Sequence, residues 1–360
     1  MTRLLLLLGS IFVFLMLTVP ASGQYIDARM PAPGQERPRV FQGDGIGAPQ
    51  FCSVDSILRD SVSVQALRNY RELRKMQPEG ALVYSLMEDF TVGDERDFRV
   101  RNIETNDWST VSFVLRAVSD RLRLWVEEGE FAPDQVNQEV IDGLMTALDA
   151  QTPPLSRDPG QGILDNNSLI FGDAPDIDGS GVLNILITDV QDGWEPDSEG
   201  GFVAGFFDPV DLDPSNSNSN KADIIYLNSR PLIYFDGEVN PFRVRSTAAH
   251  EYQHLIHANY GALNTFQNEG QSEWAELLNG YQGRAPLYLS QPAELRRFLY
   301  GWRRGEDDVS NDYQRGSLLH SFIADRAGEA LTGSITRATD SGNAAYEDAL
   351  DQAGIGLEEW

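Results

Sequence analysis

The sequence is poor in cysteine and in basic residues. The first shortage excludes a disulfide within the chain, and the second argues against two classes of binding partner. Only one cysteine, Cys52, occurs in 360 residues, so no disulfide can form within the chain. Lysine and arginine number 28 against 55 aspartates and glutamates, which gives a formal net charge of −27. Binding to nucleic acids or to anionic membranes needs a basic protein surface, which a chain this acidic lacks. We therefore expect neither as a partner.

Long hydrophobic runs are missing after the N-terminus. Residues 1–23, MTRLLLLLGSIFVFLMLTVPASG, combine Arg3, an apolar stretch and a small-residue end. This pattern predicts a secretory signal peptide cleaved near Gly23, so we expect a secreted protein, extracellular or periplasmic, that no membrane holds after cleavage. A retained N-terminal anchor is the alternative, although the apolar stretch is short for a membrane span.

The remaining chain is typical of a folded protein, with 41% hydrophobic and 10% aromatic residues. Residues 24–78 begin with a Pro/Gly-rich stretch and are interpreted as a pro-segment or linker. We expect an α+β fold, with a β-rich N-terminal lobe at 79–261 and a mostly helical C-terminal lobe at 262–360. The last residues, AGIGLEEW, have no polar tail, as expected of a chain that continues past Trp360.

Hydrophobic periodicity predicts the elements of both lobes. Alternating or continuous apolar runs indicate strands at 81–92, 97–104, 122–128, 182–190 and 222–229. Helical spacing indicates helices at about 56–76, 133–150, 268–279, 292–302, 312–327 and 344–353.

Three of the four histidines fall in one short window, TAAHEYQHLIHANYG, at residues 247–261. On a helix His250 and His254 lie one turn apart on one face, so both imidazoles can bind one ion. Glu251 beside them can hold a water molecule at the same point. HEYQH therefore matches the HExxH pattern of zinc proteases, with Glu251 as the general base.

A catalytic zinc ion needs a third protein ligand, which leaves one position for water. His257 is one candidate, but a continuous helix places it two turns from His250. The metzincin pattern is broken, because residue 257 is not glycine and residue 260 is Tyr260. The better candidate is Glu269 in NEGQSEWAELL, with Glu273 one turn later able to hold a ligand histidine.

These motifs resemble those of the gluzincin metallopeptidases, in which HExxH is followed by an Asn-Glu pair in a later helix. The resemblance implies a zincin-like fold and Zn²⁺ bound by His250, His254 and Glu269. It assigns Glu273 to support His250. The HEYQH and NEG segments, which follow the run IIYLN, are similar to those of secreted bacterial proteases of the hyicolysin and immune inhibitor A kind. The exopeptidase motif Gly-x-Met-Glu-Asn is absent upstream, so recognition of a free amino terminus is not implied.

The C-terminal lobe offers two donors for the oxyanion of a peptide hydrolysis reaction, Tyr313 and His320. They are seven residues apart and share a helix face. Tyr313-Gln314-Arg315-Gly316 is similar to a Tyr-x-Lys-Gly segment of aminopeptidase-like gluzincins, which favours Tyr313. His320 stays the second choice, since thermolysin-like enzymes use a histidine for this role.

A second metal is indicated by DAPDIDGSG, in which Asp176, Asp178 and Ser180 match the first, third and fifth positions of a calcium loop. Ile187 stands at the twelfth position, where a bidentate glutamate belongs. A Ca²⁺ ion would therefore need further oxygens, such as Asp173 or a backbone carbonyl. Calcium binding and a plain Asp/Gly turn both remain open, and 211–220 is a weaker case of the same kind.

The sequence therefore predicts a secreted zinc endopeptidase that acts on protein or peptide substrates. Cys52 is either a small apolar residue or a thiolate that blocks the zinc in a latent precursor. The main alternative function is a catalytically silent binding or adhesion module that keeps the fold. A zinc hydrolase for a non-peptide bond is a third. The natural substrate and the oligomeric state are not predicted.

Overall fold

The structure is a computed structural model, and it describes residues 50–52, 57, 60–76, 89–196, 201–260, 264–281, 302, 309–338 and 342–354. All of them belong to one unit, Gly47–Trp360. The expected signal peptide, the expected helix at 292–302 and residues 81–88 of the first expected strand lie outside the described residues. Within the described ranges, no helix is long and apolar enough to cross a membrane.

A seven-stranded mixed sheet forms the N-terminal part, in the order β1-β6-β7-β5-β4-β3-β2. Strands β4, β5 and β7 run parallel to one another, whereas β3 runs antiparallel to β4 and β6 runs antiparallel to β7. The strands are β1 (Gln50–Cys52), β2 (Glu95–Arg101), β3 (Trp108–Val118), β4 (Leu122–Glu127), β5 (Leu183–Thr188), β6 (Phe202–Phe206) and β7 (Ile224–Asn228). A short second sheet pairs β8 (Tyr234–Phe235) with β9 (Glu238–Val239).

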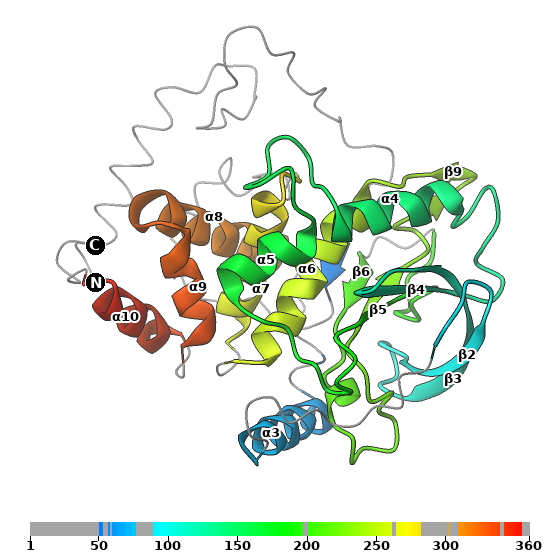
Figure 1. Ribbon diagram of the computed structural model, residues 1–360, viewed down its shortest axis with the longest axis horizontal. Coiled ribbons are helices and arrows are strands. Elements are labelled where there is room, and N and C mark those ends of the chain that lie inside the picture. The colour runs from blue at the N-terminus through cyan, green and yellow to red at the C-terminus, as the bar shows by residue number, and fades with distance from the viewer. Residues whose placement is uncertain are drawn as a thin grey trace, which may run out of the picture. The chain divides into compact units, whose positions relative to one another are not determined.

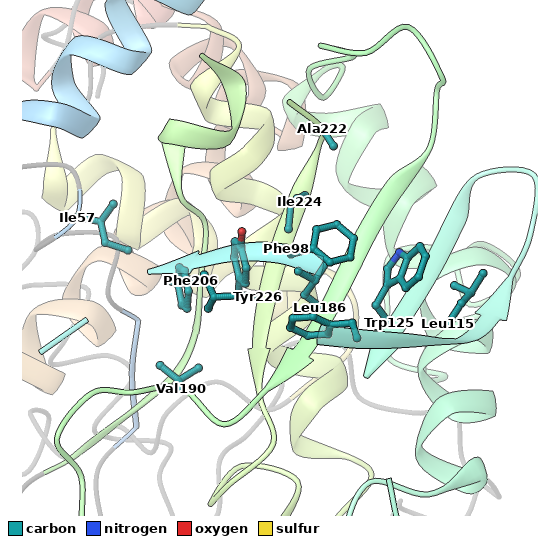
Figure 2. Close-up of a cluster of buried hydrophobic side chains, with 12 residues drawn as sticks. Ile57, Phe98, Leu115, Trp125, Leu186, Val190, Phe206, Ala222, Ile224 and Tyr226 are labelled. Carbon is teal, nitrogen blue, oxygen red and sulfur yellow. The ribbon is translucent and has the colours of Figure 1, made fainter. Parts of the chain in front are cut away.

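The central strands are apolar because both faces of the sheet are covered. Every residue of β5 and β7 is buried, as expected of parallel strands between two layers. On one face, aromatic rings from several strands pack edge to face, with Phe98 and Trp125 centroids 5.3 Å apart. Figure 2 shows this cluster, which also includes Leu186, Phe206 and Tyr226.

Helix α6 lies against the sheet at β6 and β7 and also packs against α5 and α7 (Figure 1). The later helices have a core of their own, which includes Ile323, Leu331 and Tyr346. The helices are α3 (Ser61–Met76), α4 (Gln138–Asp149), α5 (Ile163–Phe171), α6 (Arg243–Ala258), α7 (Thr265–Leu278), α8 (Val309–Ala327), α9 (Glu329–Arg337) and α10 (Asn343–Gln352), with a short 3-10 helix η1 (Pro209–Leu212).

The expected α+β class is confirmed. Most predicted elements that fall on described residues are present within a few residues of their expected ends. The described end of the first expected strand, 89–92, is not a strand. The longer elements that were not predicted from the sequence are β3, β6, α5 and α9, and the short elements β1, η1, β8 and β9 were not predicted either.

Residues that were expected to be a pro-segment or linker contribute to this unit. Strand β1 pairs with β6 in parallel, at the edge of the sheet. Helix α3 packs against η1 and buries Ala66, Leu67 and Tyr70. The Tyr70 hydroxyl donates to Asn259 Oδ1 at 2.6 Å, just after α6 ends. The part of 24–78 that the structure describes is therefore packed onto the fold.

Helices α7 and α8 cross at two glycines. A Cβ atom on Gly316 would lie 2.7 Å from the Cα atom of Gly270, and a Cβ on Gly270 would lie 2.8 Å from the Cα of Gly316. Only glycine permits backbones to approach this closely. Gly270 follows Glu269 directly and Gly316 lies one turn after Tyr313. The crossing therefore brings these two candidate site residues into the same region.

Candidate metal centre

Helix α6 carries the HEYQH motif with its residues turned into the protein. From Thr247 to Ala258 every side chain is buried. His250 and His254 are one turn apart, and their ring centroids are 4.8 Å from each other. The sheet on one side and α7 on the other exclude solvent from these rings. The spacing expected from the sequence is thus realised on a buried helix.

Helix α7 supplies the carboxylate that meets both histidines. Asn264 begins the helix, and its side chain accepts a hydrogen bond from the Gln267 amide at 3.2 Å. Glu269 follows in the first turns and is fully buried. Its Oε2 atom lies 3.3 Å from His250 Nε2 and 3.4 Å from His254 Nε2. The structure therefore brings together His250, His254 and Glu269.

The spacing of these three donor atoms fits a tetrahedral zinc ion. Zinc binds histidine nitrogen and carboxylate oxygen at roughly 2.0–2.1 Å, so neighbouring ligand atoms are roughly 3.3–3.4 Å apart in a tetrahedron. The two measured donor separations, 3.3 and 3.4 Å, equal that value. In addition, His254 Nε2 and Glu269 Oε1 are buried and make no hydrogen bond with any described residue. The cluster is therefore suited to a bound cation.

The other ring nitrogens are held by hydrogen-bond acceptors that fix the tautomer. His254 Nδ1 lies 3.1 Å from Asn268 Oδ1 and 3.0 Å from Ser272 Oγ. His250 Nδ1 lies 3.0 Å from Glu276 Oε1. A proton on Nδ1, donated to these acceptors, leaves the Nε2 lone pair of each ring directed to the metal position.

Glu276 contacts the candidate site, although this was not predicted from the sequence. The resemblance assigned the support of His250 to Glu273, but Glu273 Oε1 lies 3.8 Å from His250 Nδ1, farther than Glu276 Oε1. The hydroxyl of Ser246 donates to the second oxygen of Glu276 and holds this carboxylate in place. Glu276 lies two turns after Glu269 on α7, so both point to α6. The seven-residue spacing between Glu269 and Glu276 could have predicted from the sequence that both residues face the same helix.

The charge of Glu269 is stabilised by its neighbours. Burial alone raises the pKa of a carboxyl group, but the charge of His254 and the close ring nitrogens of both histidines outweigh burial here and hold the Glu269 pKa at about 2. The carboxylate is thus the dominant form at neutral pH, as a metal ligand requires.

Glu251 is buried beside strand β6. A Cβ atom on Gly205 would lie 3.0 Å from Glu251 Cγ and 2.8 Å from the Tyr226 carbonyl oxygen, so a side chain at this position would displace the sheet or the helix. Strand β6 therefore approaches α6 closely at the candidate base. The backbone of Cys52 in β1 pairs with the backbone of Gly205, so the edge of the sheet begins next to Glu251.

The two candidate oxyanion donors are in different surroundings. The Tyr313 ring lies 6.4 Å from the His250 ring, centroid to centroid, and 4.8 Å from the Trp302 ring. His320 is fully buried behind α7, with Nδ1 2.8 Å from the Gly316 carbonyl oxygen and Nε2 3.0 Å from the Tyr346 hydroxyl. Both ring nitrogens of His320 are thus engaged, and burial lowers its pKa to about 4. Only Tyr313 is beside the metal cluster.

His257, the other candidate for the third ligand, is buried on α6. Among the described residues it belongs to no group of metal-binding side chains. Burial and, to a smaller extent, the charge of His254 lower its pKa to about 3, so the ring is neutral. The structure gives it no part in the cluster of His250, His254 and Glu269.

The aspartates of the candidate calcium loop also gather in the structure. Asp176 and Asp178 approach Asp223, which the sequence analysis did not include. The Ser180 hydroxyl accepts a hydrogen bond from the Val182 amide at 3.1 Å. Asp173, the suggested source of a further oxygen, is exposed and is not in this group.

The fold and the site together define a mixed α+β protein with a buried His-His-Glu cluster that fits a metal ion. No protein-family model matches the chain. It is 26% identical over 238 residues to the neutral metalloprotease ShpI of Staphylococcus hyicus, an alignment that covers 64% of this chain and 49% of ShpI. The chain thus spans about half the length of this curated relative.

The contacts of His250 predict unequal effects of two neighbouring carboxylates. Glu276→Gln removes the negative charge of the acceptor that lies 3.0 Å from His250 Nδ1, so we expect metal affinity to fall about 10–100-fold. Glu273→Gln, the matched control on the same helix, should change it by less than about threefold. Competition with a chromophoric zinc chelator measures both. A larger loss in Glu273→Gln would return the supporting role to Glu273.

Proposed function

We propose that this chain is a zinc-dependent endopeptidase of the gluzincin kind that hydrolyses peptide bonds in proteins or peptides. The observation that carries the proposal is the spacing of the His250, His254 and Glu269 donor atoms. The similarity to a neutral metalloprotease supports it. A relationship to the hyicolysin and immune inhibitor A proteases is the finer form of the same proposal.

Three side chains would hold the ion, namely His250, His254 and Glu269, through two nitrogens and one oxygen. Zinc bound by three protein ligands acidifies a water molecule and polarises the carbonyl group of a substrate. Asn268 and Glu276 keep the imidazoles in the tautomer that presents Nε2. Their role is to position the ligands.

Glu251 is the proposed general base. It follows the first ligand histidine in the sequence and lies in a buried site between α6 and β6. Its carboxylate takes the proton of the attacking water and returns it to the leaving amine. Because the close approach of Gly205 leaves little space beside Glu251, its side chain has a restricted position.

Tyr313 is the proposed oxyanion donor. Its ring lies beside His250, and the Trp302 ring packs against it. A phenol hydroxyl can donate to the negative oxygen that develops on the substrate carbonyl. His320, the second choice, uses both ring nitrogens in contacts with Gly316 and Tyr346.

The function is tested by Glu251→Gln. We expect this variant to bind one zinc ion as the wild type does and to cleave casein about 10²-fold more slowly or worse, because it lacks the base. Removal of zinc by a chelator should abolish cleavage, and added Zn²⁺ should restore it. Zinc content by mass spectrometry serves as the control.

The same experiment separates the alternative functions. A silent binding or adhesion module would show no casein cleavage in the wild type, although it would still bind zinc. Unchanged cleavage by Glu251→Gln would assign the chemistry to another residue. A zinc hydrolase for another bond would fail with casein but act on an ester or amide model substrate, and Glu251→Gln would abolish that activity.

The oxyanion role is tested by Tyr313→Phe. We expect kcat to fall about 10²-fold with little change in KM and with full zinc content, because only the transition state loses a hydrogen bond. Tyr346→Phe is the matched control, since it removes a buried hydroxyl that contacts His320. Equal losses in both variants would point to general damage of the helical lobe instead.

Secretion and N-terminal processing belong to the same proposal. We propose that the signal at 1–23 directs export and that the 24–78 segment restrains the enzyme. Strand β1 lies on the outer edge of β6, and its Cys52 backbone pairs with Gly205 next to Glu251. An extended peptide that adds to the sheet here would need the same edge.

Processing should therefore precede full activity. We expect the form that starts near residue 24 to cleave casein slowly, and limited proteolysis before α3 to raise the rate at least about tenfold, since β1 competes with substrate. N-terminal sequencing of the active form identifies the cut. Full activity of a form that starts near residue 24 would contradict a restraining segment.

A further inference from the structure

Three aspartates from separate parts of the chain meet at one end of the sheet. Asp176 and Asp178 lie in the loop between α5 and β5, and Asp223 directly precedes β7. Strands β5 and β7 are parallel neighbours, which brings the loop next to Asp223. One carboxylate oxygen from each aspartate lies within 4.8 Å of the other two.

Asp223 is buried and only half satisfied. Its side chain is 3% exposed, and Oδ2 accepts a hydrogen bond from the Ile177 amide at 3.1 Å. Oδ1 is also buried and accepts no hydrogen bond from the part of the chain that the structure describes. Burial and the nearby charges of Asp178 and Asp176 raise the pKa of Asp223 well above its usual value. A buried carboxylate oxygen without a partner costs free energy unless a cation binds it.

A second buried aspartate, Asp211, has hydrogen-bond donors for both of its carboxylate oxygens. Asp211 lies in the 211–220 region and is 2% exposed. Its Oδ1 accepts two hydrogen bonds from Asn220, at 3.0 and 2.8 Å, and its Oδ2 lies 2.8 Å from the Tyr226 hydroxyl. Asp211 therefore needs no ion. Among the residues that the structure describes, Asp223 has no equivalent set of donors.

We propose that Asp176, Asp178 and Asp223 bind a hard divalent cation, Ca²⁺. The donors are carboxylate oxygens, which calcium prefers, and the loop is irregular, which suits its flexible coordination. Gly179 and Gly181 turn the loop with φ of 69° and 65°, values that favour glycine. Asp223, directly before the neighbouring strand β7, supplies the carboxylate that Ile187 cannot provide at the twelfth loop position.

The site also connects to the metal-binding helix. Asp173 in the same loop receives a hydrogen bond on its carbonyl oxygen from Asn259 Nδ2 at 2.9 Å, and its amide donates to the Tyr260 hydroxyl at 2.7 Å. Both partners follow the last turn of α6. A bound Ca²⁺ thus stabilises a loop that holds the end of the helix with His250 and His254.

The test measures Ca²⁺ binding directly and does not depend on protease activity. The zinc-loaded full chain, freed of calcium, is dialysed against radioactive Ca²⁺ at about 1 mM or below. We expect one equivalent to bind and about 1 mM Ca²⁺ to raise Tm by roughly 5 °C, with a smaller effect of Mg²⁺. Asp178→Asn and Asp223→Asn should each weaken binding at least about tenfold.

Asp173→Asn is the matched control, because it makes the same charge change in the same loop outside the cluster. It should bind Ca²⁺ as the wild type does. Absence of binding in the wild type, or unchanged binding in Asp178→Asn, would overturn the proposal. If Asp223→Asn does not fold, Asp178→Asn alone decides the result, since Asp178 is only partly buried.

Discussion

The buried carboxylate of Glu269 between two imidazoles is the contact on which the candidate site depends. A charged group that is buried away from water needs a partner of opposite charge or a hydrogen-bond donor nearby. In the part of the chain that the structure describes, the groups in contact with Glu269 Oε2 are the Nε2 atoms of His250 and His254. This requirement fixes how α7 sits against α6. The packing of the two helices and the geometry of the donor atoms are therefore one constraint.

The second constraint is close backbone approach on both sides of that pair. Gly205 allows β6 to reach Glu251, and Gly270 with Gly316 allows α8 to reach α7. Larger residues at these positions would move Glu251, the proposed base, or Tyr313 away from the histidines. Glycine at three positions thus sets the width of the site, although none of them carries reactive chemistry. A catalytic arrangement needs positions fixed to within about 0.5 Å, and rigid helices and strands supply this more reliably than loops do.

The sequence predicted what depends on local patterns and missed what depends on partners distant in sequence. The apolar runs of β5 and β7 and the HEYQH helix were predicted because their residues face a core on every side. Strand β6, FVAGF, was missed because it is short and contains glycine, which is poorly suited to strands. Glu276 was missed because a one-turn spacing was assumed, whereas the nitrogen of His250 is reached from two turns away.

The two acidic loops show why such a site cannot be read from spacing alone. Both 176–180 and 211–220 have the aspartates and small residues of a cation loop. In the second, Asn220 and Tyr226 donate hydrogen bonds to the buried carboxylate of Asp211. Burial and the charge of Asp208 raise the pKa of Asp211 to about 8. In the first, Asp223 lies directly before β7, and one of its oxygens accepts no hydrogen bond from the described residues. A structural carboxylate differs from a metal ligand in the hydrogen-bond donors that surround it. These donors come together only in the folded chain.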